Sequence, residues 1–207
     1  MTERLPLTHH PLVHPLSLGR LIARAGSGNY KVHGSKESVG CVVVPAFGQR
    51  QEGDRKVPGE SNQALARLTR QLFPGVPVIA QWEVDDALRE QNDGAGAPYR
   101  IEEHAKPGAY LDTREVVRQA AEMITTGGLD GHVGVLAHPH HMPRADASMG
   151  AVLFDGRSTV AVPGVEVPWD EQSSQRQTRS PKDWGTREAV AIGMYAARGW
   201  IDLSHAA

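Results

Sequence analysis

The stretch Val133-Gly134-Val135-Leu136-Ala137-His138-Pro139-His140-His141-Met142-Pro143-Arg144 begins as an apolar run and ends in a cluster of polar residues and prolines. The apolar run is too short to form a helix of its own, so it predicts a strand that is buried on both faces. Pro143 suits the first turn of a helix, where its missing N–H costs nothing. The polar cluster therefore lies where a strand gives way to a helix. In an open parallel sheet, ligands bind at that edge.

Further apolar runs alternate with segments of helical periodicity along the rest of the chain. We predict strands over residues 41–46, 76–81, 99–101, 132–137 and 159–162. We predict helices over residues 16–25, 61–73, 82–90, 113–126, 143–154 and 186–198. This alternation predicts an α/β fold with a doubly wound, mostly parallel sheet and helices on both faces, which is a Rossmann-like three-layer arrangement.

The length of 207 residues favours one domain spanning residues 1–207. Residues 1–14 have the composition of an irregular arm, and residues 47–60 that of a polar loop. Residues 164–183 form a second long polar connection without periodicity. Because long loops inside compact domains are commonly functional, we expect this connection to lie over the carboxyl edge of the sheet and to be mobile without ligand.

The composition describes an ordinary globular protein with a net charge of −2. No basic run is present and aromatic residues are few, so we expect no nucleic-acid partner. The single cysteine, Cys41, lies in an apolar run and is predicted to be a buried core thiol. No segment approaches the roughly 20 apolar residues that cross a bilayer, and the N-terminus lacks a signal-peptide core. We therefore expect a cytoplasmic protein that does not bind membranes.

Several familiar site motifs are missing from the sequence. It contains no G-x-G-x-x-G fingerprint, no P-loop, no His-Glu-x-x-His pair and no G-x-S-x-G elbow. The histidines at 138, 140 and 141 lack the helical spacing of metal ligands, so packed or solvated side chains are favoured and no metal residue is assigned. A metal site at this cluster stays open as a weaker alternative.

The segment His140-His141-Met142-Pro143-Arg144-Ala145 resembles the aromatic-His-Met-x-Arg-Ala signature that follows a strand in the YdcF/SanA/ElyC-like proteins of bacteria. The segment Asp112-Thr113-Arg114-Glu115-Val116 is similar to the Asn-Thr-x-Glu-Asn helix start of that family. The likeness covers roughly residues 40–165 and depends mostly on His-Met-x-Arg. It is closest to the soluble YdcF type, which implies binding of S-adenosylmethionine without a settled reaction.

The sequence departs from the family at several of its turns. Pro45-Ala46-Phe47-Gly48 stands where the family has a Gly-rich turn, and Ala80-Gln81-Trp82 stands where it has Ser-Gly-Gly. Asp112 and Val116 replace two asparagines of the family pattern. We therefore expect any shared ligand to be bound differently in detail.

We predict that His141, Glu83 and Glu115 are the catalytic residues. A histidine can act as an acid or a base near neutral pH. Glu83 follows a predicted strand, and Glu115 lies in the first turn of a predicted helix. Each also has an ordinary structural interpretation, because a capping box explains Glu115, a first-turn glutamate explains Glu83, and a backbone carbonyl can satisfy His141.

We predict ligand contacts from Gly48, Gln81, Thr113, Arg144 and His138. Arg144 offers a rigid fork of donors that suits a carboxylate or phosphate, and lies three residues after His141. Thr113 can instead belong to the capping box. Positions that follow parallel strands share one edge of the sheet, so we expect six residues to meet in one crevice. They are Gly48, Glu83, Thr113, Glu115, His141 and Arg144.

Two functions from different classes fit this arrangement. The first is an enzyme that acts on a small anionic or nucleotide-like substrate, where Arg144 holds the anion, His141 transfers a proton, and Glu83 or Glu115 orients the substrate. The second is a non-catalytic module that binds S-adenosylmethionine or a nucleotide. A metal-dependent hydrolase is a third and weaker possibility.

Overall fold

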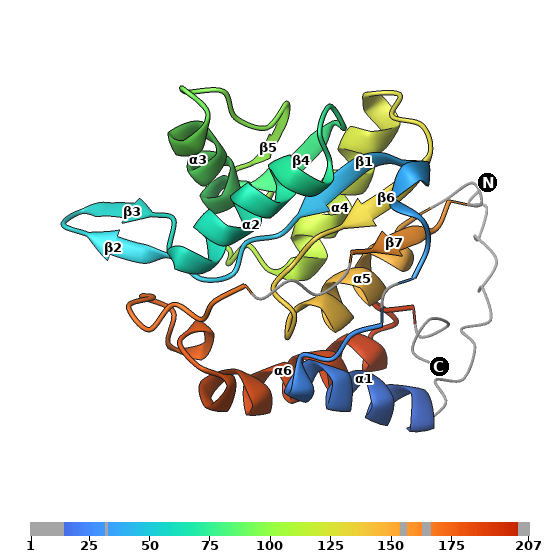
Figure 1. Ribbon diagram of the computed structural model, residues 1–207. Helices are drawn as coiled ribbons and strands as arrows, with labels where there is room; N and C mark the ends of the chain where they lie inside the picture. The colour runs from blue at the N-terminus through green and yellow to red at the C-terminus, as the bar shows by residue number, and fades with distance from the viewer. Residues whose placement is uncertain (1–14, 32, 154–156, 163–166, 203–207) are drawn as a thin grey trace, which may run out of the picture.

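The computed structural model describes residues 15–31, 33–153, 157–162 and 167–202. Its centre is a five-stranded sheet in the order β5-β4-β1-β6-β7, and each neighbouring pair of strands is parallel (Figure 1). The predicted parallel arrangement of these strands is confirmed. Their bounds are β1 (Val39–Val44), β4 (Val78–Gln81), β5 (Tyr99–Ile101), β6 (His132–Val135) and β7 (Thr159–Ala161).

The strand β1 occupies the centre of the sheet because its side chains are apolar on both faces. Val42 and Val44 belong to one core cluster, whereas Cys41 and Val43 belong to the other. Consecutive side chains of a strand point to opposite faces, so a strand of this composition needs cover on both sides. Cys41 is a buried free thiol, as the sequence predicts.

Helices supply that cover. The helices α2 and α3 share a core cluster with Val42 and Val44, and α4 and α5 share the opposite cluster with Cys41 and Val43. The helices α1 and α6 pack against each other beyond α5 (Figure 1). The fold is therefore α/β with a Rossmann-like three-layer arrangement. The helices are α1 (Pro15–Ser27), α2 (Glu60–Leu72), α3 (Trp82–Gln91), α4 (Thr113–Thr126), α5 (Met142–Gly150) and α6 (Pro181–Ala197), with a short 3-10 helix η1 (Lys36–Ser38) before β1.

The predicted loop over residues 47–60 is wrong, because the structure places a hairpin there. The strands β2 (Arg50–Glu52) and β3 (Arg55–Val57) pair in antiparallel fashion around Gly53 and project from the body of the molecule (Figure 1). Most of their side chains are exposed and polar. A strand pair without a buried face leaves no apolar alternation in the sequence, which is why the pattern indicated a loop.

Two predicted helix starts also need correction. The sequence predicts Ser61 as the N-cap of α2, but the helix begins at Glu60 with Gly59 as its N-cap, and the hydroxyl of Ser61 donates to the carbonyl of Pro168 at 2.6 Å. The closing helix α6 begins five residues earlier than predicted, because the Ser180 hydroxyl accepts a hydrogen bond from the amide of Asp183 and so caps it. The predicted arm over residues 1–14 lies outside the described residues.

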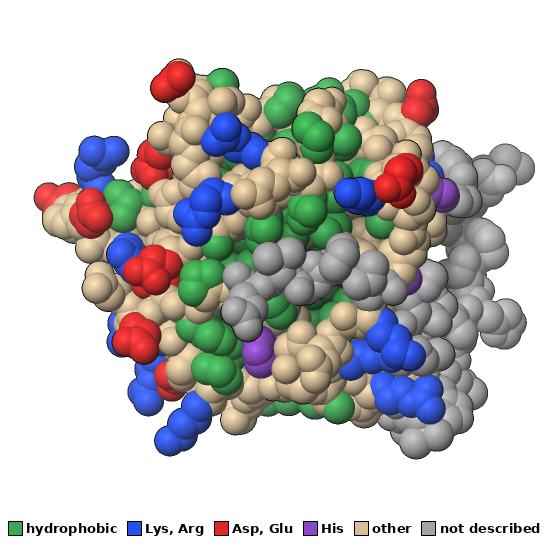
Figure 2. All heavy atoms as spheres, in the orientation of Figure 1, with side chains coloured by type: hydrophobic (Ala, Val, Ile, Leu, Met, Phe, Trp, Pro, Cys, Tyr) green, Lys and Arg blue, Asp and Glu red, His purple; other side chains and the backbone are tan. Residues whose placement is uncertain are grey.

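Charged side chains of both signs are scattered over the visible face of the molecule and do not gather in one patch (Figure 2). This distribution agrees with the small net charge of −2. Among the described residues, no helix has both the length and the apolar character that crossing a bilayer requires.

Candidate functional site

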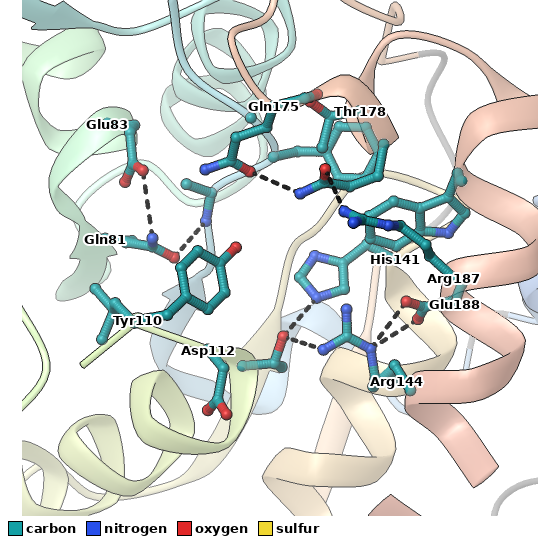
Figure 3. Close-up of a pocket in the computed structure, with 18 residues that line it drawn as sticks. Gln81, Glu83, Tyr110, Asp112, His141, Arg144, Gln175, Thr178, Arg187 and Glu188 are labelled. Atoms are coloured by element: carbon teal, nitrogen blue, oxygen red, sulfur yellow. Dashed lines mark hydrogen bonds and ion pairs between the residues drawn. The ribbon is translucent and has the colours of Figure 1, made fainter. Parts of the chain in front are cut away.

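A cavity of about 190 Å³ opens at the carboxyl edge of the parallel sheet. Its walls come from the segments that follow β1 and β4, from residues at the starts of α4, α5 and α6, and from the 3-10 helix η2 (Arg176–Thr178) (Figure 3). The cavity therefore lies at the edge where the sequence places a ligand. The polar side chains that line it are Gln81, Glu83, Tyr110, Asp112, Thr113, His141, Arg144, Gln175, Gln177, Thr178, Arg187 and Glu188.

The chain turns into the cavity at Gly48, which has a backbone φ of +76°. A Cβ at this position would lie 2.4 Å from Thr178 Oγ1 and 2.7 Å from Ser173 Oγ. Asn62 holds the turn, since it accepts from the amide of Phe47 at 2.8 Å and donates to the carbonyl of Gly48 at 2.7 Å. A glycine is therefore required both by the backbone angle and by the close approach of the neighbouring segment.

Gln81 and Glu83 form the wall that follows β4. The Gln81 side-chain oxygen accepts from the amide of Ala46 at 3.1 Å, and its nitrogen donates to Glu83 Oε1 at 3.4 Å. The other carboxyl oxygen, Glu83 Oε2, is buried and has no partner among the described residues. Burial raises the pKa of Glu83 to about 8, against an opposing effect of Lys56. Glu83 therefore carries a proton over most of the neutral range.

The start of α4 brings Thr113 into the cavity. Asp112 caps this helix, because its Oδ1 accepts from the amide of Glu115 at 2.9 Å. The Thr113 hydroxyl is buried and contacts His141 Nε2 at 2.9 Å and a guanidinium nitrogen of Arg144. Thr113 is thus a member of the cavity wall, as predicted.

Glu115 does not reach the cavity, so its predicted meeting with the other site residues is wrong. Its carboxylate accepts from Arg118 at 2.7 and 2.8 Å and from the amide of Ala105 at 3.1 Å. The hydrogen bonds from Arg118 lower the pKa of Glu115 to about 2. Glu115 follows Thr113 by two residues, which is about 200° around a helix, so the two side chains point to opposite sides. Only the Asp112 half of the predicted capping box forms.

His141 stands at the N-cap position of α5 and its ring lies in the wall of the cavity (Figure 3). Its Nε2 contacts Thr113, while its Nδ1 is buried and has no partner among the described residues. Burial, the charge of Arg144 and the neighbouring His138 hold the pKa of His141 well below its usual range. The imidazole is therefore neutral at neutral pH.

Arg144 lies beside His141 on the cavity wall, but its charge is already matched. Its Nε donates to both carboxylate oxygens of Glu188, at 2.8 and 3.0 Å. Burial alone would lower the pKa of Arg144, yet Glu188 raises it above its usual value. The guanidinium of Arg144 is therefore already paired with Glu188 of the same chain, which does not agree with its predicted role of binding a free anion.

His138 does not line the cavity, contrary to the expected ligand contact. Its ring stacks on Phe47 at 3.8 Å between centroids, with only 5° between the planes. Burial and the neighbouring His140 lower its pKa to about 3. A neutral, buried ring in face-to-face contact with Phe47 is a packing element of the wall behind the cavity.

The described part of the connection that leads to α6, residues 167–180, lies over the carboxyl edge, as predicted, whereas residues 164–166 lie outside the described residues. Its residues Gln175, Gln177 and Thr178 line the cavity. The buried carboxylate of Asp170 accepts from Arg50 at 2.7–3.0 Å and from the amide of Glu60 at 3.2 Å. These contacts anchor Asp170 to the hairpin and to α2, and the mobility of the connection without ligand stays a prediction.

Several residues of the cavity wall were not predicted from the sequence, among them Glu188, Arg187 and Tyr110. Glu188 and Arg187 lie in α6. The sequence pattern of this segment predicts a closing helix but does not indicate a site. Tyr110 stands at the mouth with 69 % of its surface exposed, which is unusual for a large aromatic side chain. The Arg-Glu doublet in the second turn after the Ser-Pro helix start could have indicated the α6 pair. That turn lies close to the loop that precedes the helix.

No protein-family model, curated protein or solved structure matches this chain. Among the described residues, no group of three or more His, Cys, Asp and Glu side chains is placed to hold a metal ion.

Proposed function

We propose that this chain is an enzyme that transfers a proton to or from a small anionic or nucleotide-like substrate bound at the carboxyl edge of the sheet. One observation carries the proposal. Two buried titratable side chains, Glu83 and His141, line one cavity, and each has a polar atom without a partner among the described residues. Unsatisfied buried polar atoms are costly, so each one calls for an explanation, and a ligand or a reaction is the explanation that fits two titratable groups in one cavity.

The protonation states of the two residues support acid–base chemistry. At neutral pH Glu83 is mostly protonated and His141 is neutral, because burial disfavours the charged form of each. A carboxyl group whose pKa lies near the working pH can both give and take a proton efficiently. In this proposal Glu83 transfers the proton, and His141 contacts the reacting group.

The size and lining of the cavity support a small substrate. About 190 Å³ is less than the roughly 300–1,000 Å³ of sites that enclose drug-sized ligands. The exposed Tyr110 ring at the mouth offers a flat surface for a base or another planar group that extends outside. Arg187, which donates to Gln177 at 2.8 Å, brings a positive charge to the same wall. A small acid fits inside the cavity, whereas a nucleotide fits only in part.

The first experiment is a screen of thermal stabilisation with nucleotides, S-adenosylmethionine and phosphorylated metabolites, because a ligand of the native state raises its stability. Each compound that binds is then incubated with the protein and its products are followed by mass spectrometry. Replacing Glu83 by Gln should keep binding and reduce turnover by about 100-fold or more, the range of general acid–base catalysis.

Glu90→Gln is the matched control, since Glu90 lies on the same helix but is exposed and outside the cavity. Equal turnover by the wild type and Glu83→Gln would overturn the proposal. The alternative of a binding module, favoured by the resemblance to proteins associated with S-adenosylmethionine, predicts binding without turnover in the wild type. It also predicts that His141→Gln leaves binding unchanged.

A further inference from the structure

Four buried side chains of the cavity wall, the first of them on α6, are linked by consecutive hydrogen bonds. Glu188 accepts from Arg144, and a second guanidinium nitrogen of Arg144 donates to the Thr113 hydroxyl. That hydroxyl lies 2.9 Å from His141 Nε2. Figure 3 shows the chain of contacts running from Glu188 through Arg144 to the His141 ring.

The direction of these hydrogen bonds follows from counting protons. A guanidinium has only donors, so Arg144 cannot accept the proton of the Thr113 hydroxyl. Among the contacts of the described residues, His141 Nε2 is then the acceptor available to that proton. A neutral imidazole that accepts at Nε2 carries its proton at Nδ1. The unpartnered Nδ1 of His141 is therefore an N–H donor.

The hydrogen bonds on the opposite wall of the cavity also leave a donor without a partner among the described residues. The Gln81 oxygen is fixed by the amide of Ala46, so its nitrogen must be the group that donates to Glu83 Oε1. In the protonated form of Glu83, which burial favours, the oxygen that accepts this hydrogen bond is the carbonyl oxygen, so the acidic proton lies on Oε2, which has no partner among the described residues. Arg187 adds the donors of its guanidinium to the same cavity.

Two negative groups also line the cavity. Asp112 contributes a carboxylate, but its Oδ1 is engaged as the cap of α4, and the partial positive charge of that helix end offsets part of its field. The second carboxylate, Glu188, is paired with Arg144.

We propose that Glu188, Arg144 and Thr113 are positioning residues that hold His141 as the Nδ1–H tautomer, and that the cavity consequently binds the oxyanion group of its ligand, a phosphate or a carboxylate. His141 Nδ1, Glu83 Oε2 and the Arg187 guanidinium are the donors that contact this group. The two donors on buried side chains, His141 Nδ1 and Glu83 Oε2, bind an anionic oxygen more strongly than water-exposed donors do, and the exposed Arg187 adds its positive charge. The inference uses the site of the proposed function but requires no turnover.

The tautomer can be measured by long-range proton–nitrogen NMR of protein labelled with ¹⁵N-histidine, with the His141 signals assigned by their loss in His141→Gln. We expect the Nδ1–H pattern in the wild type and in Thr113→Ser, which keeps the hydroxyl. Thr113→Val removes the hydroxyl with little change of shape and should abolish that preference. An Nε2–H pattern in the wild type, or an unchanged Nδ1–H pattern in a folded Thr113→Val, would overturn the inference.

The ligand class can be tested by calorimetric titration with inorganic phosphate and, separately, with acetate. We expect Arg187→Gln and Thr113→Val each to weaken binding about tenfold or more, because a hydrogen bond to a charged group contributes at least that much. Thr113→Ser should bind as the wild type does. Arg67→Gln is the control, because Arg67 is exposed on α2 and does not line the cavity.

Binding of phosphate alone identifies a phosphate ligand, and binding of acetate alone identifies a carboxylate. Failure of both anions to bind would overturn the inference. These outcomes are separate from those of the proposed function. Anion binding with wild-type turnover in Glu83→Gln would refute the acid–base role only, whereas reduced turnover in Glu83→Gln with an Nε2–H tautomer would refute the inference only.

Discussion

Arg144 and Glu188 form a buried two-point ion pair that joins α5 to α6, with distances of 2.8 and 3.0 Å from Nε to the two carboxylate oxygens. Only 2 % of the Glu188 side chain is exposed. Removing one partner from such a pair leaves the other charge buried without compensation, which is far more costly than losing a surface pair. The pair therefore contributes to stability as well as to the geometry of the cavity.

We expect Glu188→Ala to lower the free energy of unfolding by about 3–5 kcal/mol, the usual cost of an uncompensated buried charge. Glu122→Ala is the control, because Glu122 forms an exposed pair with Arg118 on α4. That variant should lose no more than about 1 kcal/mol. Urea unfolding at neutral pH measures both values. Equal losses of unfolding free energy in the two variants would show that the Arg144–Glu188 pair contributes no more to stability than an exposed pair does.

The turn at Gly48 gives a second prediction. Gly48 and Gly75 share a φ of +76°, but a Cβ at Gly75 would meet nothing within 4 Å. Gly75→Ala should therefore cost about 1–2 kcal/mol of stability from the backbone angle alone. Gly48→Ala should cost more, since its Cβ also collides with Thr178 and Ser173. Thermal unfolding of both variants separates the cost of the backbone angle from the cost of the collision. Equal losses of stability would contradict the close approach of Thr178 and Ser173 to Gly48.

The contact between His33 and Asp146 predicts a pH-dependent contribution to stability. His33 Nε2 lies 2.8 Å from Asp146 Oδ2, and this hydrogen bond raises the pKa of His33. Burial alone would raise the pKa of Asp146, but its hydrogen bonds, first that of His33, lower it. The raised histidine stabilises the fold below its unfolded pKa of about 6.5, and the lowered aspartate stabilises it above its unfolded pKa of about 3.8.

The contribution of this pair is therefore greatest between those two values. Compared with His33→Gln, the wild type should be favoured most near pH 5 and should lose that advantage as the pH rises through the raised pKa of His33. Denaturant unfolding of both proteins across this range makes the comparison. A stability difference that stays constant from acid to alkaline pH would rule out a charged His33 in the folded state.

Glu83 also predicts a stability that falls as the pH rises. Its pKa rises from 4.5 to about 8 on folding, because burial disfavours the carboxylate. Between these values the folded chain binds more protons at this site than the unfolded chain does, so stability falls as the pH rises. Glu83→Gln lacks this titration. The variant should gain stability relative to the wild type from pH 5 to pH 8, and parallel pH profiles would place the Glu83 pKa near its ordinary value.

The layers of the fold could be predicted from sequence because burial leaves a periodic pattern. The run that includes Val133 and Val135 is apolar on both faces, and parallel topology then fixes which positions follow the strands. That reasoning placed Gly48, Glu83 and His141 at one cavity. The β2–β3 hairpin could not be predicted in this way, because exposed strands have no buried face and leave no alternation of apolar residues in the sequence.

The finer assignments failed where contacts from distant residues decide the outcome. Position in the first turn of α4 could not show that Glu115 faces Arg118 while Thr113 faces the cavity. The partner of Arg144 is a residue 44 positions later, and no local pattern indicates such a pairing. His138 immediately follows a buried strand, and its stacking on Phe47 depends on how another loop packs.

The late position of α6 in the chain has a consequence for biosynthesis. Gly48 and Glu188 both line the cavity, and at about 5–20 residues per second the ribosome needs roughly 7–28 s to pass from one to the other. Until then the Arg144 guanidinium has no Glu188 to pair with, so the ion pair that joins α5 to α6 forms only after α6 has been synthesised. The nascent chain can form its central strands early, but the cavity is complete only once α6 has been added.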